Sequence, residues 1–180
     1  MSLLGDITLN KLSLNNSRKN KTNNYINEFL KNSDSRDMTN DYSSTATDFE
    51  YEPTEKCKIY RMMIYIEDNS SMKYEDFGGI TNGLTNGIRV WYKETSGSSK
   101  VYIDGGFAIK TNRDFAKLCY DVDIKTAGSG NNHFASRWTF ANSGTLIYLN
   151  SGGSIGVTLN DDLSSLVQFE IVIQGFSFVG

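Results

Sequence analysis

The sequence has little of what several common functions require. Its 180 residues include one His, one Pro and two Cys. No apolar run approaches the ~20 residues that a membrane-spanning helix needs. Lys and Arg total 18 and Asp and Glu total 21, so the net charge of −3 supplies no basic field for nucleic acid. We therefore expect neither a nucleic-acid partner nor a membrane association.

The two cysteines, Cys57 and Cys119, form no Cys-x-x-Cys pair. Two thiols in a reducing compartment are the favoured interpretation, and a disulfide between them stays open. The N-terminal residues lack the pattern of a secretory signal, because Leu3-Leu4 is followed at once by Gly5-Asp6. The sequence therefore predicts a protein that folds in a cytoplasm.

Catalytic chemistry has little support. His133 follows the Gly-Asn-rich stretch 128–132, so a nucleophile–His arrangement would have to recruit it from a loop. No Gly-x-Ser-x-Gly or His-Glu-x-x-His motif occurs. Asp121, Asp123 and the Asn-Asp-Asp run at 160–162 offer carboxylates for Ca²⁺, but EF-hand spacing is missing and solvated or turn-capping roles are favoured. We expect no enzyme, no catalytic residue, no metal site and no cofactor.

Residues 1–56 differ in composition from the rest of the chain. Asn, Ser, Thr, Lys and Asp dominate residues 10–40, and such low hydrophobicity does not offset an ordering entropy of roughly 1–2 kcal/mol per residue. Basic residues come first and acidic residues follow, either by chance or to pair with charged patches on neighbouring subunits. We predict a long polar N-terminal arm over 1–56, extended or disordered, that orders on neighbours. Deleting residues 1–55 should then spare the fold.

Within this arm, residues 23–31 carry four apolar side chains at helical spacing. The spacing predicts a one- or two-turn amphipathic anchor, although helices this short are marginal in water. We expect the four to bind a partner: Tyr25, Ile26, Phe29 and Leu30.

Residues 57–180 have the pattern of a β-domain. Sixteen Gly and a single Pro indicate many tight turns, and the 20 Tyr and Phe residues can fill a core. A short helix is expected after a cap at 111–112. We predict an all-β fold, an antiparallel, jelly-roll-like β-sandwich. The expected strands are 59–66, 88–93, 100–103, 107–110, 120–125, 134–140, 145–150, 154–160 and 167–178.

A tandem repeat, Ile-Thr-Asn-Gly at 80–83 and Leu-Thr-Asn-Gly at 84–87, is the clearest local feature. Each Asn-Gly favours positive φ, so two successive tight turns are expected. We interpret the segment from 77 to 87 as a structural loop first and a contact loop second. Its predicted partner-binding residues are Phe77, Thr81, Asn82, Gly83, Thr85, Asn86 and Gly87.

Several segments together resemble one family. They are Leu-Thr-Asn-Gly-Ile at 84–88, Ile-Lys-Thr-Asn at 109–112, the run 114–123, Arg-Trp-Thr-Phe-Ala-Asn-Ser-Gly at 137–144, and 159–163 through Gln-Gly-Phe at 174–176. In combination they resemble small virion proteins of tailed bacteriophages over about residues 58–178. The family carries no catalytic motif. Its histidine in the last strand is replaced here by Gln168-Phe169, so no role rests on that position.

The resemblance implies a virion structural protein: a capsid decoration or cement protein, or a neck or fibre-attachment subunit. Its expected partners are other virion proteins, such as major capsid or neck proteins, and further copies of itself. It would fold in the host bacterial cytoplasm and end in the virion. The alternative is a carbohydrate- or receptor-binding sandwich, although core packing is the commoner use of strand aromatics. The candidate stacking residues are Trp91, Tyr92, Tyr102, Trp138 and Tyr148.

Overall fold

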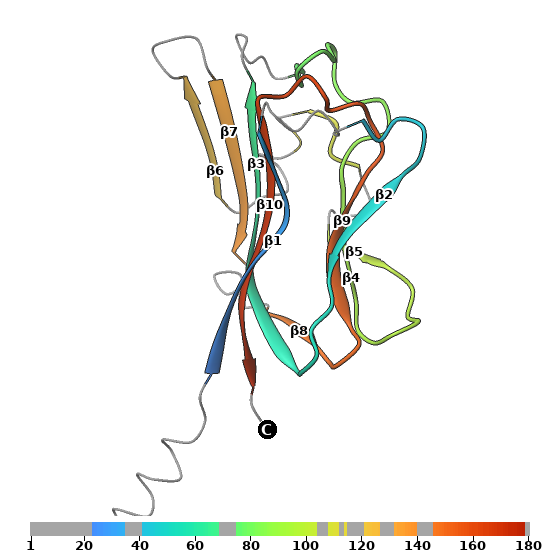
Figure 1. Cartoon of the computed structure of the whole chain (residues 1–180), viewed down its shortest axis with the longest axis vertical. Helices are drawn as coiled ribbons and strands as arrows, with labels where there is room; N and C mark the ends of the chain where they lie inside the picture. Colours follow the sequence, from blue (N-terminus) through green and yellow to red (C-terminus); the bar gives the residue numbers. More distant parts are fainter. Residues whose placement is uncertain are drawn as a thin grey trace, which may run out of the picture.

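The computed structural model describes residues 23–34, 41–68, 75–103, 108–111, 114, 121–126, 132–139 and 146–178. The regular elements of these residues are β-strands, which form two antiparallel sheets facing one another (Figure 1). The predicted all-β antiparallel sandwich is confirmed. The strands are β1 (Asn23–Asp34), β2 (Thr47–Tyr51), β3 (Cys57–Asp68), β4 (Arg89–Lys93), β5 (Val101–Tyr102), β6 (Asp121–Thr126), β7 (Asn132–Thr139), β8 (Ile147–Leu149), β9 (Ser154–Leu159) and β10 (Gln168–Phe178).

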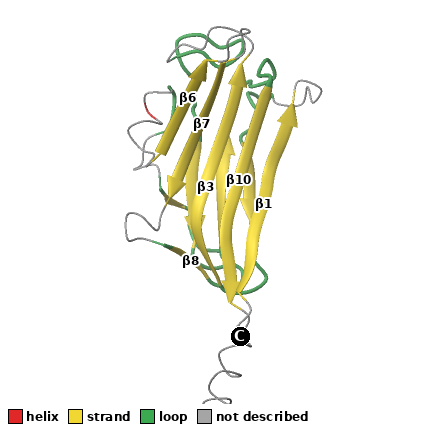
Figure 2. Ribbon diagram, turned by 90° about the vertical axis from the view of Figure 1, so that its left-hand side faces the viewer, coloured by secondary structure: helices red, strands yellow, loops and turns green. Residues whose placement is uncertain are grey.

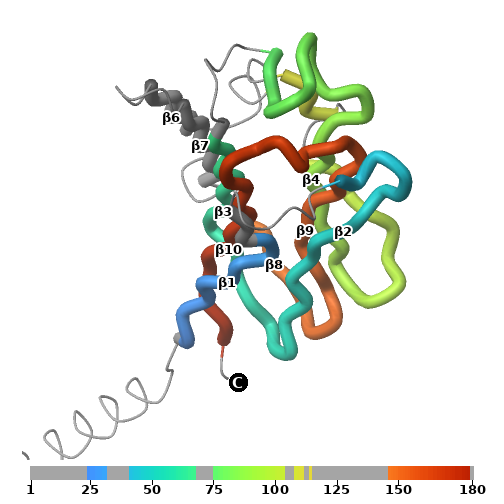
Figure 3. The backbone as a smooth tube through the Cα atoms, turned by 45° about the horizontal axis from the view of Figure 1, so that its top comes forward, coloured from blue at the N-terminus to red at the C-terminus, as the bar shows by residue number. Residues whose placement is uncertain are grey.

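The strand pairs are nested along the chain. β1 pairs with β10, β2 with β9, β3 with β8 and β4 with β5, all antiparallel. The chain is thus one long hairpin that rolls up, which places β1-β10-β3-β8 in one sheet and β2-β9-β4-β5 in the other (Figure 3). Eight strands in this order make a jelly roll, so the jelly-roll-like expectation is confirmed.

Strands β6 and β7 enlarge the first sheet. β7 pairs with β3 over residues 61–68 and β8 pairs with β3 over residues 57–59, so the two follow one another along the same side of β3. β6 pairs with β7 and forms one edge of this large sheet, while β1 forms the opposite edge (Figure 2). The small sheet has β2 and β5 at its edges.

Two strands lie where the sequence predicts an arm. β1 pairs with β10 and β2 pairs with β9, so residues 23–34 and 47–51 are ordered by this chain's own sheets. The boundary predicted at residue 57 is therefore wrong, because tertiary pairing overrides the weak strand propensity of an Asn-rich segment. Deleting residues 1–55 would remove an edge strand from each sheet, so that deletion is no longer expected to spare the fold. Residues 1–22 lie outside the described residues.

Aliphatic side chains fill the space between the sheets. On β10, Phe169, Ile171 and Ile173 face this core, and β3 supplies Ile64 and Ile66 opposite them. Burying each such side chain stabilises the fold by about 1.5–3 kcal/mol. The small sheet contributes Val90, Ile155, Val157 and Leu159 from the other side. The other face of each sheet points away from this core, and the two outer faces carry candidate interaction surfaces.

The expected helix start at 111 has the geometry of a cap. The Asp114 N–H donates to Thr111 Oγ1 at 3.3 Å, and the Thr111 N–H donates back to Asp114 Oδ2 at 3.0 Å. This reciprocal pair is a capping box. The rest of the expected helix lies outside the described residues.

Candidate interaction surfaces

The tandem repeat forms two turns of different conformation. Asn82 and Gly83 both have positive φ, at 69° and 85°, whereas Gly87 at 84° is the one such residue of the second copy. The Gly83 N–H donates to the carbonyl oxygen of Glu75 at 2.6 Å, and the Leu84 N–H donates to that of Lys110 at 2.9 Å. The loop is therefore tied to the chain on both sides.

The carboxylate of Asp161 holds the second turn. Asp161 is 5% exposed, and its two oxygens accept the backbone N–H groups of Thr85 at 2.9 Å, Asn86 at 3.1 and 3.2 Å, and Gly87 at 2.7 Å. Consecutive N–H groups that converge in this way form an anion-binding nest, which here is filled by the chain's own side chain. The 160–162 run thus supports a loop, in line with its structural interpretation.

The loop residues predicted to bind a partner divide into two groups. Phe77 is fully buried, and Gly87 is buried beside Ile109. Neither can meet a partner, so these two predictions are wrong: the apolar character of Phe77 serves the core. Gly83 is half-buried. The remaining four are exposed at the loop surface and stay candidates: Thr81, Asn82, Thr85 and Asn86.

The four apolar residues of the predicted anchor lie on a strand, so the helical prediction is wrong. Ile26 is 7% exposed and faces the core, and Leu30 packs against the core beside a β-bulge between 29 and 31. Tyr25 and Phe29 are instead 87% and 52% exposed. Apolar residues at i, i+1, i+4 and i+5 fit a strand as well as a helix, because i and i+4 share one face of a strand and i+1 and i+5 share the other. Tyr25 and Phe29 therefore remain candidates for a contact, whereas Ile26 and Leu30 belong to the fold.

An aromatic strip covers one end of the large sheet's outer face. Tyr25 lies opposite Phe176 across β1 and β10. The ring centroid of Phe176 is 6.3 Å from that of Tyr60 and 5.6 Å from that of Phe178. Tyr148, on β8, is 59% exposed. We call the set the outer aromatic strip: Tyr25, Phe29, Tyr60, Tyr148, Phe176 and Phe178.

Two cations accompany the strip. The Lys58 Nζ atom lies 5.0 Å from the ring centroid of Tyr148 and 4.7 Å from that of Phe178, within cation–π range. Arg61 Nη1 donates to Gln174 Oε1 at 3.3 Å, and Gln174 Nε2 donates to Asn27 Oδ1 at 3.2 Å. These contacts form a polar row across β3, β10 and β1. The arrangement joins exposed rings to positive charge, which suits a protein interface.

Sequence reasoning missed most of this strip. Tyr60, Phe176 and Phe178 were apolar residues in predicted strands, with no sign of which sheet face they occupy. Lys58 precedes the strand predicted over 59–66, so the sequence did not assign its side chain to either face. The alternation of 169, 171 and 173 with 172, 174 and 176 on β10 is the signal that separates core from outer face, and it needs a fixed register to be useful.

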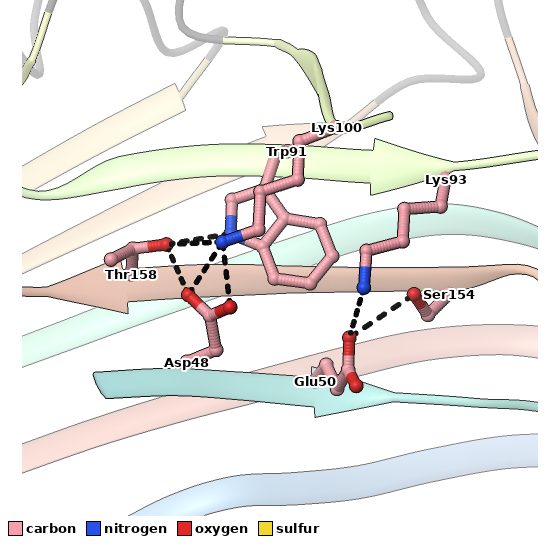
Figure 4. Close-up of polar contacts among 7 residues, drawn as sticks. All are labelled: Asp48, Glu50, Trp91, Lys93, Lys100, Ser154 and Thr158. Atoms are coloured by element: carbon pink, nitrogen blue, oxygen red, sulfur yellow. Dashed lines mark hydrogen bonds and ion pairs between the residues drawn. The ribbon is translucent and has the colours of Figure 1, made fainter. Parts of the chain in front are cut away.

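The outer face of the small sheet is closed by an ionic network (Figure 4). Trp91 lies at its centre, fully buried, and its Nε1 donates to Thr158 Oγ1 at 2.9 Å. The Nζ atoms of Lys93 and Lys100 lie 4.9 and 4.5 Å from the Trp91 ring centroid. Trp91 is therefore covered and cannot stack on a sugar, so its place in the predicted platform is wrong.

Each lysine also pairs with a carboxylate of β2. Lys100 Nζ lies 2.6 Å from Asp48 Oδ2, and Lys93 Nζ lies 3.2 Å from Glu50 Oε2. Burial opposes ionisation of Asp48, but hydrogen bonds from Lys100 and Thr158 and the positive charge of the lysines together lower its pKa below the ordinary value. The acidic residues of β2 thus neutralise the lysines of this face.

The remaining sequence candidates contribute less. His133 lies on β7 and Asp121 and Asp123 lie on β6, but the described geometry there is that of the backbone, as it is for Trp138. Among side chains that the structure describes, no group of three His, Cys, Asp or Glu could hold a metal ion. Cys57 is a buried free thiol, and Cys119 lies outside the described residues.

No protein-family model, curated protein or solved structure matches this chain. Within the described residues, none of the elements is a helix with the length and apolar character needed to cross a bilayer. The surfaces above are therefore the basis for assigning a function.

Proposed function

We propose that the chain is a structural subunit of a bacteriophage virion that acts by protein–protein assembly and performs no catalysis. It is a capsid decoration or cement protein, or a neck or fibre-attachment subunit. Its partners are major capsid or neck proteins together with further copies of itself. The resemblance of segments within residues 58–178 to small virion proteins of tailed phages suggests this role.

The observation that carries the proposal is the outer aromatic strip on a jelly roll. Jelly rolls build viral capsids, but lectins and cupins use them too, so the fold alone leaves the function open. Stable protein contacts have an apolar, aromatic-rich centre and a polar rim, and bury about 800 Å² per partner. Tyr25, Phe29 and Tyr148 are each more than half exposed, and Lys58 and Arg61 flank the rings. Such a surface supports a docking role.

The test is to locate the protein in the particle and then to alter the strip. Mass spectrometry of purified particles should detect the chain, and cryo-electron microscopy should place it at regular capsid or neck positions. Particles assembled with Tyr148→Lys should incorporate the chain at least tenfold less. The matched control is Val101→Lys, because Val101 is also exposed, at 43%, but lies on β5 of the other sheet. A chain absent from particles, or equal incorporation of the two variants, would refute the proposal.

A second proposal is a carbohydrate- or receptor-binding module. Tyr148 favours it, since an exposed ring on a sheet face offers a stacking surface. Tyr102, although 43% exposed, is covered on one side by the Arg89 guanidinium, 3.8 Å from its ring centroid. Glycan-array binding that disappears in Tyr148→Ala and survives in Tyr102→Ala would support this function, and an array without binding would remove it.

A further inference from the structure

We infer that the free edge of β1 pairs with β1 of a second copy of this chain, antiparallel and across a two-fold axis. The two large sheets would then join into one. The inference concerns association in solution, so it stands or falls separately from the virion role.

The edge itself is the first observation. In the described part of the chain β10 is the one strand that pairs with β1, and β1 lies at the margin of the large sheet (Figure 2). A long edge strand without Pro is a template for pairing with another chain. The other edges are less suitable: β2 and β5 have five and two residues, and Asp121, Asp123 and Lys125 occur within the six residues of β6. β1 has twelve.

The spacing of the two exposed rings is the second observation. Two antiparallel strands can be related by a two-fold axis perpendicular to the sheet. The numbers of any two directly opposite residues then add up to the same total, and at the axis one residue lies opposite its own copy. An axis at Asn27 places Tyr25 opposite Phe29 of the partner subunit, and does so twice. An axis at Tyr25 or at Phe29 would pair one ring with its own copy and leave the other ring without an aromatic neighbour.

This register also agrees with the rest of β1. The bulge between residues 29 and 31 ends regular alternation just beyond Phe29, so the regular part of the strand contains both rings. Glu28 would lie opposite Ile26 of the partner subunit, so no like charges meet directly. Cross-strand aromatic pairs stabilise a sheet more than most others. The paired edge would make the two outer aromatic strips continuous.

The area sets the strength of the contact. Aromatic side chains bury about 150–250 Å² each, so Tyr25 at 87% and Phe29 at 52% exposure offer together about 280 Å² per subunit. That is well below the roughly 800 Å² per partner of a standard stable interface, even with the backbone of the strand added. The dimer is therefore weak in dilute solution and gains strength where copies are held together on an assembly.

Sedimentation of the full chain from about 10 μM to 1 mM tests the inference. We expect the weight-average mass to rise toward that of a dimer, and Tyr25→Lys or Phe29→Lys to weaken association at least tenfold. Val101→Lys is the matched control, because Val101 is also exposed, at 43%, but lies on β5 of the other sheet, away from the edge. A monomer throughout this range, or a dimer lost in Val101→Lys and kept in Tyr25→Lys, overturns the inference.

A crosslink tests the register directly. In a Cys119→Ser background, Asn27→Cys should form a disulfide-linked dimer on mild oxidation, since the two Cα atoms would lie about 4.5–5.5 Å apart. Asn24→Cys should not, because it would lie opposite residue 30 of the partner subunit. Equal crosslinking of the two variants overturns the Asn27-centred register, and crosslinking of neither overturns the edge pairing.

Discussion

The Oδ2 atom of Asp161 accepts the backbone N–H of Gly87 at 2.7 Å, although the two residues lie 74 positions apart. With the bonds from Thr85 and Asn86, this contact fastens the second Thr-Asn-Gly turn to the end of β9. The polar loop of the tandem repeat is therefore part of the folded framework.

Replacing Asp161 should cost a large part of the stability. Asp161→Ala removes the carboxylate that accepts the part-buried N–H groups of Thr85 and Asn86 and the buried N–H of Gly87, and we expect the free energy of unfolding to fall by about 2–4 kcal/mol. Asp162→Ala is the control, since Asp162 is exposed and accepts one N–H, from Ser164. Its loss should stay below about 1 kcal/mol. Urea unfolding at pH 7 measures both, and equal losses would contradict the supporting role of Asp161.

Replacing Gly156, which lies against Trp91, should destabilise the small sheet. A Cβ there would lie 2.5 Å from the carbonyl oxygen of Phe49 and 2.8 Å from Trp91 Cζ2, so Gly156→Ala must push β2 or the indole aside. We expect a loss of about 1–3 kcal/mol from overpacking and a changed tryptophan fluorescence spectrum.

The control for that change is Gly97→Ala. Gly97 has φ of 78° and no atom within 4 Å of the added Cβ, so its cost is the backbone strain of about 1–2 kcal/mol with an unaltered spectrum. An unaltered spectrum in Gly156→Ala would show that the indole does not rest on this glycine.

Much of the fold was predictable from the sequence, because strand runs with turn residues between them are local signals. The expected strand over 59–66 became β3, and that over 167–178 became β10. β1 was not predictable, since its order depends on pairing with β10, which lies more than a hundred residues away. Composition alone therefore assigned a paired strand to an arm.

The candidate surfaces were less predictable than the fold. Trp91 and Tyr148 look alike in sequence, as aromatic residues of short strands, yet one is fully buried and the other is 59% exposed. The difference arises because two lysines and the carboxylates of β2 cover Trp91, and that cover depends on which strands are neighbours. Exposure of an aromatic residue is a property of the sheet order, which no local pattern contains.

Acid should weaken the small sheet through Asp48. The pKa of Asp48 is lowered in the folded protein, so its ionised form adds stability that is fully present above the ordinary value of 3.8 and is lost as the pH falls through the lower, folded value. Because the side chain is 39% exposed, the effect should stay within about 1 kcal/mol.

Asp48→Asn provides the comparison. Urea unfolding between pH 2 and 6 should show a shallower acid loss for this variant than for the wild type. Identical slopes below pH 4 would show that the ion pair with Lys100 adds no stability.

Alkali should destabilise the protein through Cys57. Burial raises the pKa of its thiol from 9.0 to about 11, so the neutral thiol adds stability that is full below pH 9 and is lost as the pH rises toward 11. Two pH units correspond to at most about 2.7 kcal/mol. Tyr65 loses its proton in a neighbouring pH range, because burial and its hydrogen bond to Glu67 raise its pKa to about 12. Cys57→Ala leaves Tyr65 in place, so the difference between the two proteins reports the thiol together with its effect on Tyr51, whose pKa is raised by burial and by the charge of Cys57.

The decisive measurement is unfolding free energy from pH 7 to 11 for the wild type and Cys57→Ala. The smaller side chain of the variant lowers its stability by the same amount at every pH. Above pH 9, the stability of the variant should fall less with rising pH than that of the wild type. In a Cys119→Ser background, Cys57 should also resist alkylation at pH 8 until urea unfolds the chain, because a buried neutral thiol offers almost no thiolate. Rapid labelling of the folded protein would mean that the end of β3 opens far more readily than its packing against β8 and β10 implies.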